Sequence, residues 1–127
     1  MVLAAVLGLP PALAALGGES SQLVLDWGAF GRLHLGLDAL SGFFLLPVLG
    51  LSALAAVYGV DYLAPQAARR HIGLASFLFN ALVASIVLVI LARDALGFLL
   101  AWELMALSSF FLVAFENDQG AVREAGW

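Results

Sequence analysis

Long apolar runs, separated by short clusters of charged and polar residues, make up most of this chain of 127 residues. Only 11% of its residues are charged, against about 25% in a soluble domain. About 20 apolar residues in a helix cross the hydrocarbon core of a bilayer, and a helix satisfies its own backbone hydrogen bonds there. We therefore expect an all-α membrane protein with about four transmembrane helices, in which residues 1–127 form a single membrane segment of a longer polytopic helical bundle. The predicted helices span about residues 2–16, 39–60, 72–91 and 95–115.

The segment between the first two runs, residues 17–38, has a different pattern. Residues 23–28 and 32–37 alternate in part between apolar and polar side chains, and a glycine-containing stretch separates them. Alternation on both sides of such a stretch is typical of two paired strands. We expect an interfacial loop here with a possible short β-hairpin.

Composition excludes several classes of function. The chain has no cysteine, so it supplies no disulfide, thiolate metal site or iron–sulfur ligand. Its two histidines are far apart in the sequence, and we expect no metal site and no cofactor in this chain. A net charge of −4, with five arginines and no lysine, argues against nucleic-acid binding. No nucleophile–base pair, phosphate loop or dinucleotide motif is present, so we expect no catalytic centre.

Glu103 is the only ionisable residue between the ends of the run from Asp94 to Phe115. It would lie about 13 Å along the helix axis from Asp94 and about 18 Å from Phe115, at about 1.5 Å per residue. A carboxylate at that depth costs on the order of 3 kcal/mol, and membrane proteins keep one where it faces a cavity, a partner charge or a proton path. We therefore predict that Glu103 takes part in proton translocation. The alternative is a neutral glutamate that hydrogen-bonds a neighbouring helix. Its neighbours on the same helix face are all apolar: Leu99, Leu100, Ala106 and Leu107.

Five further residues are candidate auxiliary positions: His71, Asn80, Trp102, Ser108 and Asp38. Each also has a structural interpretation. His71 is either at a proton entrance, because imidazole exchanges protons near neutral pH, or simply solvated. As structural interpretations, we expect Asn80 to form a hydrogen bond between helices and Trp102 to pack against other side chains. We expect Ser108 to hydrogen-bond its own backbone. Asp38 directly precedes an apolar run and is a good helix N-cap, with a structural ion pair near the interface as the alternative.

Arginine placement predicts the orientation in the membrane. If the chain starts in the cytoplasm, Arg69, Arg70 and Arg123 lie inside, whereas Arg32 and Arg93 lie outside. The positive-inside rule weakly favours this arrangement, so the loop of residues 61–71 is predicted to be cytoplasmic. We expect an integral membrane protein of a prokaryotic inner membrane.

Three strings resemble a known family of membrane subunits. They are Leu37-Asp38-Ala39-Leu40-Ser41-Gly42-Phe43-Phe44, Asp61-Tyr62-Leu63, and the stretch from Arg93-Asp94-Ala95 to Trp102-Glu103-Leu104-Met105-Ala106-Leu107-Ser108-Ser109. The family is that of the antiporter-like, proton-translocating subunits shared by respiratory complex I, multisubunit cation/proton antiporters and membrane-bound hydrogenases. The string from Trp102 to Val113 is most similar to the large membrane subunit of hydrogenase-4 and formate hydrogenlyase. The resemblance covers about residues 35–127.

The resemblance implies both a role and a context for Glu103. In the family, the matching glutamate belongs to the first proton half-channel and works with a lysine on a later helix. This chain lacks that lysine and the family's first helix, which implies an N-terminal fragment of a subunit several times longer. The implied partners are other membrane subunits of a respiratory or hydrogenase complex, the lipid bilayer, and protons or Na+. The implied complex is an oxidoreductase, either a hydrogenase or NADH dehydrogenase-like.

Two alternatives to the hydrogenase-type subunit remain. The first, within the family, is a subunit of complex I or of a multisubunit cation/proton antiporter. The second is a small structural or assembly membrane protein, in which Glu103 only holds a partner helix.

Overall fold

The computed structural model of the protein describes residues 2–63 and 72–115. It contains four helices, which are α1 (Val2–Leu16), α2 (Ala39–Leu63), α3 (Ile72–Leu91) and α4 (Ala95–Phe115). The last three are long and apolar enough to cross a membrane, and α1 is a shorter apolar helix. The prediction of a helical membrane protein is therefore confirmed.

The bounds of α1, α3 and α4 are the predicted ones, but α2 continues to Leu63 instead of ending at residue 60. Its last turn contains Asp61, which is exposed. A helix does not need to end where its apolar run ends, because its backbone hydrogen bonds do not depend on apolar side chains. The next proline after Leu63 is Pro65, and the residue before a proline is disfavoured in a helix.

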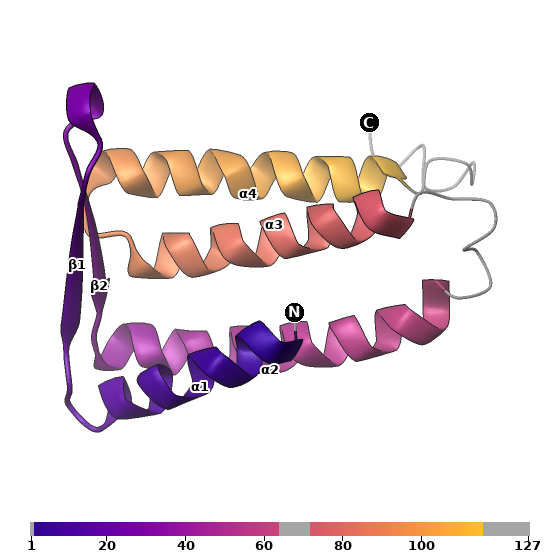
Figure 1. Cartoon of the computed structure of the whole chain (residues 1–127), viewed down its shortest axis with the longest axis horizontal. Coiled ribbons are helices and arrows are strands. Elements are labelled where there is room, and N and C mark those ends of the chain that lie inside the picture. Colours follow the sequence, from indigo (N-terminus) through magenta and orange to yellow (C-terminus); the bar gives the residue numbers. More distant parts are fainter. Residues whose placement is uncertain (1, 64–71, 116–127) are drawn as a thin grey trace.

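The helices form two antiparallel pairs, with a β-hairpin lying across one end of both (Figure 1). α1 packs along α2, and α3 packs along α4, whereas the contact between α2 and α3 is smaller. A cluster of apolar side chains joins the pairs. Its buried members are Ala5, Ala12, Leu45 and Leu49, and Val87, Ile90 and Leu91 of α3 pack against them.

Small residues bring α1 and α2 close together. A Cβ atom built on Gly42 would lie 2.6 Å from the carbonyl oxygen of Ala12, which is closer than real atoms approach. A Cβ atom on Gly8 would lie 2.9 Å from Cδ1 of Leu49. Small residues at a helix interface allow close backbone packing, which is a main source of helix association in lipid.

The hairpin consists of β1 (Ser21–Asp26) and β2 (Arg32–Leu37), which pair in antiparallel fashion. The predicted first strand, residues 23–28, was therefore placed two residues too late. The strand ends at Asp26 because Gly28 has a φ of 57°, a left-handed conformation that begins the turn. The carboxylate of Asp26 accepts a hydrogen bond of 3.0 Å from the Gly28 backbone N–H and so closes the turn.

Only β2 faces the helices. It contacts α2, α3 and α4, and Leu35 forms an isolated β-bridge with Ala92, directly after α3. All residues of β1 are exposed. The hairpin thus connects the two helix pairs at one end of the molecule through its second strand.

Candidate functional site on the fourth helix

Glu103 lies on the face of α4 that points away from α3. The buried residues of α4 are Gly97, Ala101 and Ser108, which follow one stripe of the helix at spacings of four and seven. Residues two positions from this stripe are turned by about 200° from it, at about 100° per residue, so Glu103 lies well away from Ala101. Its side chain is accordingly exposed.

Large apolar side chains surround Glu103 on this outward face. Leu99 is 58% exposed, Leu107 is 52% exposed and Phe110 is 55% exposed. Within residues 2–63 and 72–115, the structure shows no hydrogen bond or ion pair to the Glu103 carboxylate. Its partner, if it has one, must therefore come from outside the described part of the chain.

Within residues 2–63 and 72–115, Asn80 bonds its own helix and not another one. Its side-chain N–H donates to the carbonyl oxygen of Ser76, one turn earlier in α3, at 2.8 Å. Asn80 is exposed, so no other described helix lies against it. The amide could satisfy itself within its own helix because a carbonyl four residues back is always in reach.

The other auxiliary candidates do not gather around Glu103. Trp102 is exposed and meets Phe98 of the same helix edge to face, with ring centroids 5.6 Å apart. Ser108 is only 4% exposed and lies on the stripe that faces α3, away from the carboxylate. His71 lies outside the described residues.

Asp38 is both an N-cap and a member of an ion pair. Its Oδ1 accepts a 2.8 Å hydrogen bond from the backbone N–H of Ser41, in the first turn of α2. Its Oδ2 lies 2.8 Å from Nη2 of Arg93. The two structural interpretations of Asp38 are therefore both confirmed, one by each carboxylate oxygen.

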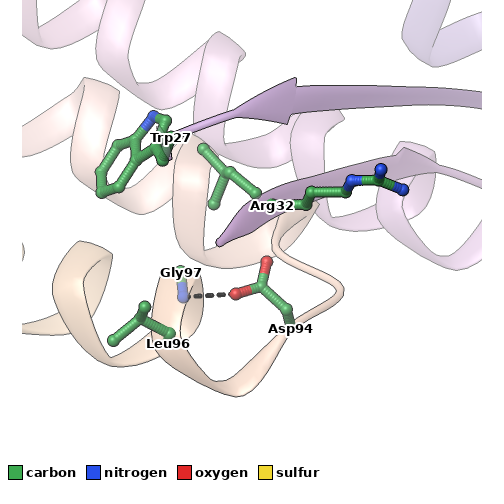
Figure 2. Close-up of a pocket in the computed structure, with 6 residues that line it drawn as sticks. Trp27, Arg32, Asp94, Leu96 and Gly97 are labelled. Carbon is green, nitrogen blue, oxygen red and sulfur yellow. Dashed lines mark hydrogen bonds between the residues drawn. The ribbon is translucent and has the colours of Figure 1, made fainter. Parts of the chain in front are cut away.

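Asp94 plays a matching part at the start of α4, shown in Figure 2. Its Oδ1 accepts a 2.7 Å bond from the backbone N–H of Gly97, and its Oδ2 accepts a 3.0 Å bond from the backbone N–H of His34 in β2. Asp94 was not predicted from the sequence to cap a helix. The N-cap was recognisable, because Asp94 directly precedes an apolar run, but the bond to His34 crosses 60 positions and left no sequence signal.

Both aspartates are stabilised as carboxylates. The backbone N–H and the hydroxyl of Ser41, together with the Arg93 guanidinium, lower the pKa of Asp38. The backbone N–H groups of Gly97 and His34 lower the pKa of Asp94. A hydrogen bond donated to an ionised carboxylate favours that form, so both groups are charged at neutral pH.

An apolar cleft of about 240 Å³ lies between the hairpin and the helices α3 and α4. It contains no titratable side chain, so it offers no ligand for a metal ion and no proton donor. The lining residues are Trp27, Leu33, Leu35, Leu88, Ala92, Gly97, Leu100, Ala101 and Leu104.

A much smaller pocket of about 10 Å³ lies beside Asp94, next to Trp27 and Arg32 (Figure 2). It has room for about one water molecule. Within the described residues, no group of three or more His, Cys, Asp or Glu side chains could hold a metal ion.

These features define the described part of the chain as a segment of a helical integral membrane protein, with one carboxylate in the middle of an apolar helix face. No protein-family profile matches the chain. It is similar to an uncharacterized protein of Mycobacterium tuberculosis, present in strains CDC 1551 and H37Rv, with 38% identity over 94 residues. It is also similar to Hydrogenase-4 component B of Escherichia coli K12, with 29% identity over 93 residues.

Each match covers 73% of this chain but only 14% of the relative. The matched part of the chain therefore spans about one seventh of the length of these curated relatives. Its apolar helices and the similarity to a hydrogenase-4 component fit part of a membrane subunit of a multisubunit complex.

Proposed function

We propose that this chain is part of a proton-translocating membrane subunit of a redox-driven complex, most like the hydrogenase-4 type, and that Glu103 lies in its proton path. A subunit of complex I or of a cation/proton antiporter is the alternative within the same class. The similarity to Hydrogenase-4 component B of Escherichia coli supports the hydrogenase-type assignment.

The observation that carries the proposal is the position of Glu103. It lies midway along a helix that is apolar enough to span the membrane, on a face with exposed apolar neighbours and no polar partner within the described residues. A carboxylate at this depth costs on the order of 3 kcal/mol unless another group compensates. Since the aligned 73% of the chain covers only 14% of the matched relatives, these are about five times as long as the chain and have room for further helices that supply such a group.

The chemistry follows from the two protonation states of the carboxylate. A positive charge close to Glu103 favours the ionised form, and withdrawal of that charge favours the protonated form. Electron transfer in another subunit that moves such a charge would make Glu103 take up a proton from one side and release it to the other. The chain itself supplies the proton carrier, and the driving reaction takes place elsewhere in the complex.

The substitution Glu103→Gln in the full-length subunit tests the proposal. Glutamine keeps the shape and the hydrogen-bonding capacity of the side chain, but it has no titratable proton. Proton movement should be abolished in membrane vesicles supplied with the electron donor, while the complex still assembles. Glu19→Gln, the same change at an exposed loop position, serves as the matched control and should pump normally. Glu103→Asp, which keeps a carboxyl group, should retain part of the activity.

Undiminished proton movement in the Glu103→Gln complex would refute the proposal. That result would favour the assembly protein instead, in which the side chain only hydrogen-bonds a partner helix and an amide serves as well as an acid.

A further inference from the structure

Arg93, in the turn between α3 and α4, contacts two separate parts of the fold. Its backbone N–H donates to the carbonyl oxygen of His34 in β2 at 2.8 Å. Its guanidinium Nη2 lies 2.8 Å from Oδ2 of Asp38 and donates to Oγ of Ser41 at 2.7 Å, both at the start of α2. One residue thus ties the second helix pair to the hairpin and to the first helix pair.

The path of the Arg93 side chain is built into the hairpin. It crosses Gly36, where an added Cβ atom would lie 2.5 Å from Nε and 2.9 Å from Cγ of Arg93. Any larger residue at position 36 would collide with the side chain. Ser41, which receives the guanidinium, is 3% exposed, and its hydroxyl donates to the carbonyl oxygen of Ile90 at 3.4 Å. We call Arg93, Asp38 and Ser41 the Arg93 clamp.

The clamp lies at one end of two long helix pairs. At this end, the polar contacts between α1–α2 and α3–α4 are made by Arg93 and Ser41. The remaining contact between α2 and α3 is a smaller apolar one. Apolar packing is non-directional, whereas a charged hydrogen-bonded pair fixes a distance and an angle. The direction of α4 relative to α2 therefore depends on this end.

We infer that Arg93 is a positioning residue for Glu103: the clamp, together with the Asp94 cap, sets the direction of α4 and so the place where the carboxylate meets its partner. This inference rests on the proposed function. Glu103 lies about 13 Å along α4 from Asp94, at about 1.5 Å per residue, so a change of tilt at the clamp displaces the carboxylate sideways. A misplacement of about 1 Å in a reacting group can cost on the order of 100-fold in rate.

The first test compares proton movement with electron transfer in the full complex. Arg93→Gln should remove most of the proton movement per electron transferred, measured at equal amounts of assembled complex. Arg93→Lys keeps the charge and should restore part of it. The matched control is Arg32→Gln in β2, because Arg32 is exposed and its side chain points away from Asp94 (Figure 2), and it should leave the ratio unchanged. A merely structural role would lower the amount of complex or its Tm without changing this ratio.

The second test measures the geometry itself, whatever the complex pumps. Spin labels at Val57 in α2 and Phe110 in α4, both exposed and both far from the clamp along their helices, report the distance between the two helix pairs. Arg93→Gln should shift or broaden this distance distribution. Labels at Leu74 in α3 and Phe110 form the control, because these two helices pack directly on each other, and their distribution should not change. If Arg93→Gln does not assemble, Ser41→Ala removes one clamp contact and should give a smaller change in the same direction.

The outcomes separate the two proposals. An unchanged distance distribution between α2 and α4 overturns the positioning role. A changed distribution with an unchanged proton-to-electron ratio also overturns it, provided that Glu103→Gln abolishes pumping. If Glu103→Gln itself pumps normally, the proposed function fails, and the positioning role, which rests on it, fails too.

Discussion

At the scale of single residues, Gly42 determines how closely α1 and α2 approach. The atom that an added Cβ would meet is the backbone carbonyl oxygen of Ala12, which cannot rotate away as a side chain could. A Cβ atom built on Gly50, two turns later on α2, would have no such neighbour within 4 Å. We therefore expect opposite effects of substitution at these two glycines of α2, because packing requires Gly42 but does not require Gly50.

Gly42→Ala should destabilise the α1–α2 pair by about 1–3 kcal/mol, because overpacking forces the backbones apart. Gly50→Ala should be neutral or stabilising by up to about 1 kcal/mol, because alanine is the better helix former. Thermal unfolding of the full subunit in nanodiscs would measure both changes. Equal effects at the two positions would contradict the assigned packing.

At the scale of elements, Asp94 binds both the start of α4 and the strand β2. Asp94 caps α4 through Gly97 and fixes β2 through His34, so the strand and the helix share one carboxylate. Gly97 lets this approach occur, since a Cβ atom there would collide with the Leu33 side chain and lie 2.9 Å from Oδ2 of Asp94. The hairpin is therefore docked on α4 through an ionised group.

This docking should depend on pH. The bonds from Gly97 and His34 lower the pKa of Asp94 in the folded protein below its ordinary value of 3.8. A carboxyl group with a lowered folded pKa contributes stability that is fully present above the ordinary value and is lost as the pH falls through the folded one. Asp94→Asn should therefore lower the Tm at neutral pH, and the difference from wild type should shrink below pH 3.8. Glu19→Gln is the control, and a difference for Asp94→Asn that did not vary with pH would argue against this linkage.

At the scale of the whole molecule, much of the apolar surface has no cover among the described residues. On α2, Leu51 and Leu54 are exposed, as are Leu99 and Phe110 on α4. Lipid would cover such a surface in part, and Glu103 interrupts it on α4, where the proposed function places a compensating neighbour. Two helix pairs joined at one end by a hairpin thus form an open segment that further helices of a longer subunit would complete.

The fold also predicts which residues share a side of the membrane. The hairpin and the α3–α4 turn lie at one end of the molecule (Figure 1), and α2 leads away from that end across the bilayer. The arginine distribution favours a cytoplasmic loop after α2. Ser20→Cys should therefore react with a membrane-impermeant maleimide in intact cells, and Gln66→Cys only after permeabilisation, in a subunit otherwise free of cysteine. The reverse pattern would invert the orientation.

The predictions that succeeded were those that depend on neighbouring residues. Helix positions follow from apolar runs, and the Asp38 cap follows from an aspartate directly before such a run. The misplaced strand and the extended end of α2 are errors at boundaries, where a glycine φ and the position of the next proline decide. The interhelical bond of Asn80 stays a prediction, because the described residues show only its bond to Ser76 in the same helix and no neighbouring helix against it.

The sequence by itself determined that this protein has apolar helices, a short hairpin and one carboxylate deep in a helix, because hydropathy and turn-forming residues act over a few neighbouring positions. The tertiary structure alone decided that Glu103 points away from α3, and that Arg93 reaches Asp38 across 55 positions by passing over Gly36. The direction of a helix face and a contact between distant residues both depend on how whole elements pack. That packing is a sum over many weak interactions that no short stretch of sequence contains.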